Sequence, residues 1–173
     1  MSRMVDSVTS LFSGEEGGGQ DATELLKDDH DRVDALFQKV KANEDGKNKD
    51  TFQKIMQELE IHTHIEEQIF YPNLLENGDE ELQKIVREGL EEHGQVKTLL
   101  AEMGSMSGDD EEFKAKLQVM MENVEHHVQE EEGEMFPLVK DQLDEQMLTR
   151  LGSLMMAEKA RMGGQSARSA SGS

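Results

Sequence analysis

The stretch EIHTHIEEQIFYP, residues 60–72, decides the fold of this chain. It holds two histidines, a cluster of glutamates, two aromatic residues and a proline, and a similar stretch, EHHVQEEEGEMFP, returns at residues 125–137. The chain has six histidines, and these two stretches contain four of them. Apolar residues in and around both stretches recur at helical spacing, which predicts an amphipathic helix for each. The doubled pattern therefore predicts a helical protein built from two similar halves.

The composition also favours an all-α protein. A chain of 173 residues is long enough for one domain with tails. Aromatic residues make up only 4% and there is no tryptophan, so Leu, Ile, Val and Met must fill the core. Glu, Lys, Gln, Leu and Met are abundant and only two prolines occur, a mixture that favours helices. No long run alternates with the period of two that marks a strand.

The charge and the missing cysteines exclude several kinds of site. A net charge of −20 repels phosphate backbones and anionic lipids, so we expect no nucleic-acid partner and no membrane-surface partner. The lack of cysteine excludes disulfides, thiolate metal sites and iron–sulfur clusters. We find neither an apolar run of the ~20 residues that cross a bilayer nor a signal peptide. We therefore expect a cytoplasmic protein.

Four helices joined by short turns form the expected body of the protein. Apolar residues at helical spacing predict these helices at residues 21–40, 51–76, 80–103 and 111–140. Such lengths and joints predict an antiparallel up-down four-helix bundle, with residues 21–142 as its domain. The two prolines lie late in the second and fourth helices, where we expect them to kink or end the helix.

The segments that flank this body have their own patterns. Residues 1–20 are expected to form a flexible N-terminal arm, in which the weakly amphipathic Met1–Ser13 can hold a protein partner. Residues 143–162 are periodic in apolar residues and are expected to form a short C-terminal helix that packs on the bundle. Residues 163–173 are of low complexity, which predicts a disordered tail.

The internal repeat selects one histidine from each cluster. In the first copy, His62 precedes Glu66 by four residues. In the second copy, both His126 and His127 have a glutamate four residues later. Only His127 also has a proline ten residues later, as His62 does, so the matched pairs are His62 with Glu66 and His127 with Glu131.

The spacing of four residues suits metal binding. It places an imidazole and a carboxylate on one helix face about 6 Å apart along the axis. At about 100° per residue, His64 points about 160° away from His62, and His126 points about 100° away from His127. One histidine on each of the other two helices completes the set. The expected metal ligands are His30, His62, Glu66, His93, His127 and Glu131.

Four imidazoles and two carboxylates are too many for one tetrahedral zinc ion. They suit two metal ions about 3.5–4 Å apart, each with two histidines, and with both glutamates as bridges. Nitrogen and oxygen donors suit iron, manganese or zinc, and we favour redox-active iron. A helical bundle without a metal remains the alternative. We expect Glu67 and Glu132 to be outer acids, and Tyr71, which points about 180° from His62, to pack between helices.

The pattern H, HxxxEExxxYP, H, HxxxEExxxxP, which begins at His30 and ends at Pro137, resembles the bacterial hemerythrin-like family, the HHE cation-binding domain. The resemblance covers residues 21 to about 140. It implies an antiparallel four-helix bundle around a non-haem di-iron centre with an oxo or hydroxo bridge, held by the six residues above. Oxygen-carrying hemerythrins have a fifth histidine four residues after the one on the third helix, where this chain has Lys97.

The resemblance therefore implies a four-histidine variant rather than a reversible oxygen carrier. We expect a di-iron protein that handles or senses O2, peroxide or nitric oxide. One alternative is an enzyme that consumes peroxide as a catalase does. Another is a regulatory module that responds to iron or oxygen and acts through its N-terminal arm.

Overall fold

The structure of this protein is a computed structural model that describes residues 19–170. Residues 1–18 and 171–173, and with them the expected partner-binding segment Met1–Ser13, lie outside the described residues. The described chain is all helical, without a strand, which confirms the predicted fold class. None of its helices is long and apolar enough to cross a membrane.

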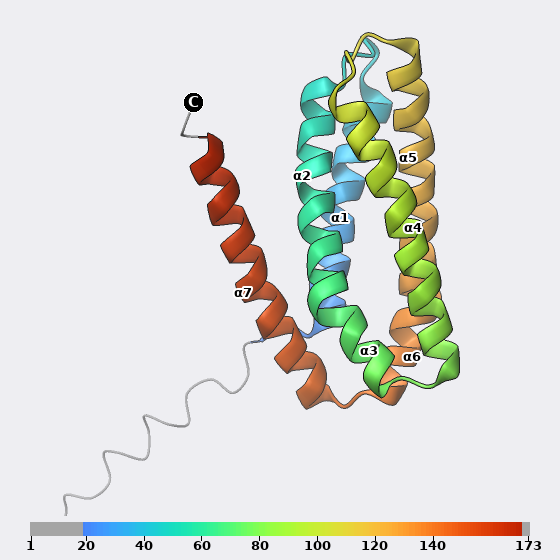
Figure 1. Ribbon diagram of the computed structural model, residues 1–173, viewed down its shortest axis with the longest axis vertical. Coiled ribbons are helices and arrows are strands. Elements are labelled where there is room, and N and C mark those ends of the chain that lie inside the picture. The colour runs from blue at the N-terminus through green and yellow to red at the C-terminus, as the bar shows by residue number, and fades with distance from the viewer. Residues whose placement is uncertain (1–18, 171–173) are drawn as a thin grey trace, which may run out of the picture.

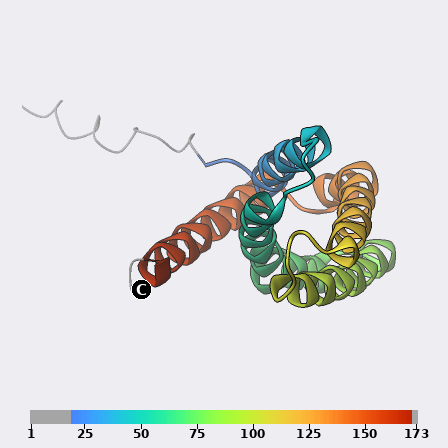
Figure 2. The same ribbon diagram turned by 90° about the horizontal axis from the view of Figure 1, so that it is seen from above.

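Four long helices run side by side as an up-down bundle (Figure 1) and surround a common axis when seen from above (Figure 2). These helices are α1 (Ala22–Ala42), α2 (Lys49–Ile65), α4 (Glu80–Gly104) and α5 (Glu111–Glu130). Each of α2 and α5 passes through a π-helical turn into a short helix. These elements are η1 (Glu66–Phe70) with α3 (Tyr71–Asn77), and η2 (Glu131–Met135) with α6 (Phe136–Gln142).

Acidic N-caps fix the first residues of α1 and α4. The Asp21 carboxylate accepts a hydrogen bond from the Glu24 backbone N–H at 3.0 Å, and the Asp79 carboxylate accepts one from Leu82 at 2.9 Å. These bonds satisfy N–H groups that have no partner within the helix, and the acids suit the positive end of the helix dipole. Both helices therefore begin within one residue of the predicted positions.

The two prolines follow π turns instead of ending their helices. Pro72 and Pro137 are the second residues of α3 and α6. In η1, the Tyr71 backbone N–H donates to the Glu66 carbonyl five residues earlier, and η2 contains the equivalent bond. Proline lacks an N–H and its ring crowds the preceding turn, so a widened turn lets the helix continue. Each π turn inserts one residue and rotates all later side chains relative to the earlier ones.

Two apolar clusters fill the bundle on either side of a polar layer. The first lies where α3, α6 and the start of α7 meet, and its aromatic members are Phe70, Tyr71 and Phe136. The second lies between the remaining parts of α1, α2, α4 and α5 and contains Phe37, Phe52 and Phe113. The buried polar layer between them contains all six residues predicted as ligands.

The C-terminal helix α7 (Glu145–Ala170) is longer than the sequence predicted. It continues past Met162 as far as Ala170, so part of the segment expected to be a tail is assigned to this helix. Its buried side chains, Leu148, Leu151 and Met155, join the first apolar cluster. The helix packs against α1, α2 and η1 at its beginning and diverges from α2 towards its end (Figure 1).

Candidate metal centre

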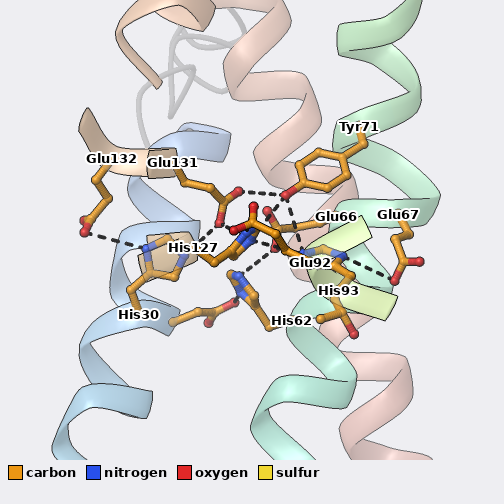
Figure 3. Close-up of polar contacts among 12 residues, drawn as sticks. His30, His62, Glu66, Glu67, Tyr71, Glu92, His93, His127, Glu131 and Glu132 are labelled. Atoms are coloured by element: carbon orange, nitrogen blue, oxygen red, sulfur yellow. Dashed lines mark hydrogen bonds and ion pairs between the residues drawn. The ribbon is translucent and has the colours of Figure 1, made fainter. Parts of the chain in front are cut away.

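Side chains from four helices and both π turns converge in the polar layer (Figure 3). Each histidine comes from a different bundle helix, and each glutamate is the first residue of a π turn. All six are buried, with at most 7% of any residue exposed. Candidate ligand atoms lie within 4.8 Å of one another in two groups, which are His30 with His62 and Glu131, and Glu66 with His93 and His127.

The four imidazoles form two pairs. The ring centroids of His30 and His62 are 4.9 Å apart, and those of His93 and His127 are 4.8 Å apart, with the same interplanar angle of 62° in each pair. Each pair joins the two helices of one half of the repeat. The structure is thus consistent with two similar halves that face one another across the bundle axis.

Both glutamates lie between the two imidazole pairs. Glu66 Oε1 is 2.8 Å from His62 Nε2 and 3.4 Å from His93 Nε2. In the same way, Glu131 Oε1 is 3.3 Å from His30 Nε2 and 3.1 Å from His127 Nε2. Each of these carboxylate oxygens thus faces one imidazole of each pair.

Many of these buried atoms lack hydrogen bonds. The unpaired atoms of the described residues are both ring nitrogens of His30, Nε2 of His62, both carboxylate oxygens of Glu66, Nδ1 of His93 and Oε1 of Glu131. A buried polar atom without a partner is costly, and such atoms are rare in folded proteins. Unpaired nitrogens and anionic oxygens that converge on one volume fit a cation, since each becomes satisfied when it binds one. The donor set therefore fits a pair of metal ions.

Two further acids hold the outer nitrogens of the histidines. Asp29 Oδ2 lies 3.1 Å from His62 Nδ1, and Glu92 Oε1 lies 3.1 Å from His127 Nδ1. A carboxylate in this position fixes the orientation of the ring and leaves Nε2 free to act as a metal ligand. The sequence analysis missed both acids, although each directly precedes the histidine of its own helix in the motifs DDHD and EEHG.

Glu67 and Glu132 lie farther out. Glu67 Oε2 is 3.5 Å from His93 Nδ1, and Glu132 Oε2 is 3.8 Å from His30 Nδ1, and neither contact is a hydrogen bond. Lys97, at the place of the fifth histidine of oxygen carriers, donates to Glu67 at 2.8 and 2.5 Å and points towards the surface.

Tyr71 reaches into the site, contrary to its expected role in packing between helices. Its hydroxyl donates a hydrogen bond to Glu131 Oε2 at 3.0 Å (Figure 3). The hydroxyl oxygen of Tyr71 is also 3.5 Å from Nε2 of both His93 and His127. Burial and the neighbouring carboxylates, chiefly Glu131, raise the pKa of this phenol well above its usual value. Tyr71 is therefore a buried, protonated hydrogen-bond donor among the candidate ligands.

The π turn explains this orientation. Tyr71 follows Glu66 by five residues, and on a regular α-helix it would point about 140° away from it. The additional residue of the π turn rotates it back by about 100°, onto the same face as Glu66. Gly89 on α4 leaves room for the hydroxyl, because a Cβ atom there would lie 3.1 Å from Tyr71 Oη.

The two histidines that the sequence excluded point away from this centre. His64 Nε2 contacts Glu158 of α7 at 2.9 Å. The side chain of His126 is 65% exposed and lies 3.1 Å from Glu130. Within the two clusters, His62 and His127 are the histidines that face the bundle axis.

Electrostatic interactions among these residues shift the pKa values of several candidate ligands. Burial opposes a charge on His62, but the carboxylates of Glu66 and Asp29 outweigh it and raise the pKa of the imidazole to about 10. For His127, burial is outweighed in the same way, mainly by Glu131, and the pKa rises. The His127 charge in turn outweighs burial at Glu131 and lowers the pKa of that carboxyl well below its usual value. A cation that binds here must displace imidazole protons.

Comparisons with known proteins agree with this architecture. A family model described as the hemerythrin HHE cation binding domain matches residues 21–139. A crystal structure of a hemerythrin HHE cation binding domain-containing protein from Mycobacterium kansasii superposes with a TM-score of 0.71 and 24% identity, over 86% of this chain and 91% of that one. This likeness shows the same fold.

Two curated proteins are also similar. An uncharacterized hemerythrin-like protein of Schizosaccharomyces pombe is 27% identical over 126 residues, which are 72% of this chain and 62% of that protein. A DNA nickase of Nostoc sp. is 24% identical over 163 residues, which are 91% of this chain and 45% of the nickase. The chain thus spans about half of the length of these relatives.

Proposed function

Since this chain belongs to the hemerythrin HHE cation-binding domain family, we propose that it is a non-haem di-iron protein that handles or senses O2, peroxide or nitric oxide. Two iron ions with an oxo or hydroxo bridge would be held by His30, His62, Glu66, His93, His127 and Glu131. The observation that carries this proposal is the convergence of buried, unpaired imidazole nitrogens and carboxylate oxygens from both halves of the repeat.

The donor set favours iron over softer metals. Imidazole and carboxylate ligands suit iron, and they also accept manganese or zinc. When bound, a pair of irons supplies reversible electron transfer to a small oxidant. The chain's own residues hold and orient this pair: the Nε2 atoms face inward because Asp29 and Glu92 hold Nδ1 of His62 and His127.

The free space beside the histidines limits the size of the ligand. A cavity of about 20 Å³ adjoins all four imidazoles, and its apolar walls are Val33, Leu59, Val96, Val124 and Val128. A single water molecule needs about 10–15 Å³ of such space, so the cavity suits a molecule with one or two non-hydrogen atoms. Its size supports a small oxidant as the ligand.

Peroxide dismutation, in which two H2O2 give one O2 and two H2O, is the second candidate. It is favoured by the buried Tyr71 hydroxyl, which donates a hydrogen bond to Glu131 and lies 3.5 Å from Nε2 of both His93 and His127. Iron-loaded protein would then evolve O2 from peroxide in many turnovers. Tyr71→Phe would keep its iron and lose most of the turnover. A single stoichiometric oxidation without O2 release would exclude this activity.

The di-iron proposal is tested by anaerobic loading of the full chain with Fe(II). We expect two irons per chain and, after exposure to O2 or peroxide, the absorption bands of an oxo-bridged ferric pair. His62→Ala should lose iron, whereas the matched variant His64→Ala should bind as the wild type does, because His64 faces α7. Less than one iron per chain in the wild-type protein would defeat the proposal.

The similarity to a DNA nickase leads to no proposal of nicking. The net charge of −20 would repel a DNA backbone, and the match covers less than half of that protein.

A further inference from the structure

The two candidate metal positions have similar inner ligands. We call the position next to His30 and His62 the A position, and the position next to His93 and His127 the B position. Each has two imidazoles and a contact to both glutamates. We therefore expect a difference in metal affinity to come from the residues that contact these ligands from outside.

The charges behind the two positions differ. At the A position, Asp29 holds His62, is 3% exposed at its side chain, and accepts hydrogen bonds from Lys159 of α7 and Arg32. At the B position, the equivalent acid, Glu92, holds His127 and pairs with no lysine or arginine of the described chain. Glu92 lies close to another acid, Glu130, and to the exposed His126.

This difference changes the donor strength of the histidines. An anionic carboxylate on Nδ1 makes an imidazole a stronger metal ligand. Lys159 neutralises this effect at Asp29 and adds a positive charge close to the A position. Glu92 keeps its effect on His127.

On the B side, Lys97 pairs with Glu67 near His93. This pair is more exposed than Lys159–Asp29, and Glu67 makes no hydrogen bond to His93. The less exposed Lys159 therefore has the larger effect, which favours a cation at the B position.

The aromatic residues are a second difference between the two positions. Tyr71 stacks on His93 with ring centroids 5.3 Å apart, and its hydroxyl oxygen lies 3.5 Å from both Nε2 atoms of the B position. The equivalent residue of the other half is Phe136, which stacks on His30 at 6.1 Å and has no oxygen. The B position thus has a neighbouring hydroxyl group that the A position lacks.

We infer that the two positions bind metal in a fixed order, the B position first and more tightly, and that Lys159 of α7 keeps the A position the weaker of the two. The inference rests on the proposed two-metal site and extends it. Lys159 is a positioning residue, since it touches Asp29 and no candidate ligand. The C-terminal helix, which lies beyond the residues matched by the family model, thereby affects the metal centre.

The test is a titration of the metal-free full chain with Co(II) alone, followed by visible absorption and by competition with a chelator. We expect two binding steps whose dissociation constants differ by at least about 10-fold, the size of effect typical of a residue behind a ligand. His62→Gln should retain the tighter step and His127→Gln the weaker step, which assigns the steps to the positions. Two equal steps, or the opposite assignment, would overturn the inference.

Substitutions of Lys159 and Glu92 test whether these residues cause the difference in affinity. Lys159→Met should tighten the second step several-fold and leave the first unchanged, whereas Lys159→Arg should keep the wild-type order. Arg161→Met is the matched control. It removes a positive charge two residues from Lys159, but Arg161 pairs with Glu158 and not with Asp29. Glu92→Gln should weaken the first step about 10- to 100-fold.

The outcomes separate this inference from the proposed function. Fewer than two Co(II) per wild-type chain would count against the two-metal site itself. Two Co(II) per chain with Lys159→Met unchanged, or with both steps shifted equally, would leave the two-metal site intact and overturn the role of Lys159. Far-UV circular dichroism of every variant confirms that the bundle is folded.

Discussion

Tyr71 donates its hydroxyl hydrogen to Glu131 Oε2 at 3.0 Å, a bond between the two halves of the repeat. The two residues come from α3 and η2, and both side chains are buried. Phe136, the equivalent of Tyr71 in the second half, makes no such bond. The doubled pattern of the sequence therefore folds into a centre that is nearly symmetric in its histidines and asymmetric around them.

Removal of this hydroxyl should destabilise the metal-free protein. Tyr71→Phe leaves Glu131 Oε2 without its donor, and a hydrogen bond to a charged group contributes about 1.5–3 kcal/mol. We expect a loss of about this size in the free energy of unfolding in urea. Far-UV circular dichroism is the suitable probe, because Tyr71 is the only tyrosine and there is no tryptophan.

Thr98→Val is the control for this variant. It removes an exposed hydroxyl that bonds only the Gly94 carbonyl of its own helix, so we expect a change within about 0.5 kcal/mol. An equal effect of both variants would show that the Tyr71–Glu131 bond contributes nothing specific.

Substitution by alanine should affect protein stability differently at two glycines of α4. A Cβ atom on Gly94 meets nothing within 4 Å, and alanine is favoured over glycine within a helix by about 1 kcal/mol, so Gly94→Ala should stabilise the protein. A Cβ atom on Gly89 would lie 3.1 Å from Tyr71 Oη and 3.4 Å from His127 Cε1. Gly89→Ala should therefore lose this gain and bind metal more weakly. Equal gains in stability with unchanged metal binding would contradict the close packing at Gly89.

Adjacent histidines on α5 should differ sharply in their effect on metal content. His127→Ala removes a buried imidazole that faces Glu131, and we expect it to lose at least one metal per chain. His126→Ala removes an exposed ring beside Glu130 and should keep the wild-type content. Metal analysis after loading and gel filtration measures both. Retention of two metals by His127→Ala would remove this residue from the ligand set.

The metal-free protein should lose stability as the pH rises above neutrality. The folded pKa of His62 is about 10, above its unfolded value of about 6.5, so its protonated form stabilises the fold. This contribution is complete below about pH 6.5 and is lost as the pH rises through about 10, by about 1.4 kcal/mol for each unit of pKa shift that is lost. Urea unfolding at several pH values, with and without metal, measures it.

Two comparisons isolate this contribution. His62→Gln has no proton to lose at this position, so its stability should fall less over the same range of pH. Metal-loaded protein should also show less decline, because its imidazoles are already unprotonated. A metal-free wild-type protein whose stability is constant from pH 6.5 to 10 would contradict the raised pKa.

The sequence predicted the helices well because their signals are local. Acidic caps such as Asp21 and Asp79 and a regular apolar stripe act within a few residues, and the structure begins α1 and α4 at these positions. The prolines were harder to interpret, because the same residue can end a helix or follow a π turn. The π turn explains why Tyr71 was expected on the wrong face.

Among the residues that contact the ligands or their partners, some had a signal in the sequence and one did not. Asp29 and Glu92 stand directly before histidines in both halves, so the repeat contained a signal for them that we did not use. Lys159 had no such signal. It lies 130 residues from Asp29 along the chain, and only the packing of α7 on the bundle brings the two together.

The sequence by itself determined an all-α bundle of two similar halves and named the six side chains that converge in it, because helical periodicity fixes which residues share a face. Only the tertiary structure decided what surrounds them. The rotation after each π turn brings the Tyr71 hydroxyl to Glu131, and the docking of α7 brings Lys159 to Asp29. Both depend on distances between separate helices, which the spacing of residues within one helix does not contain.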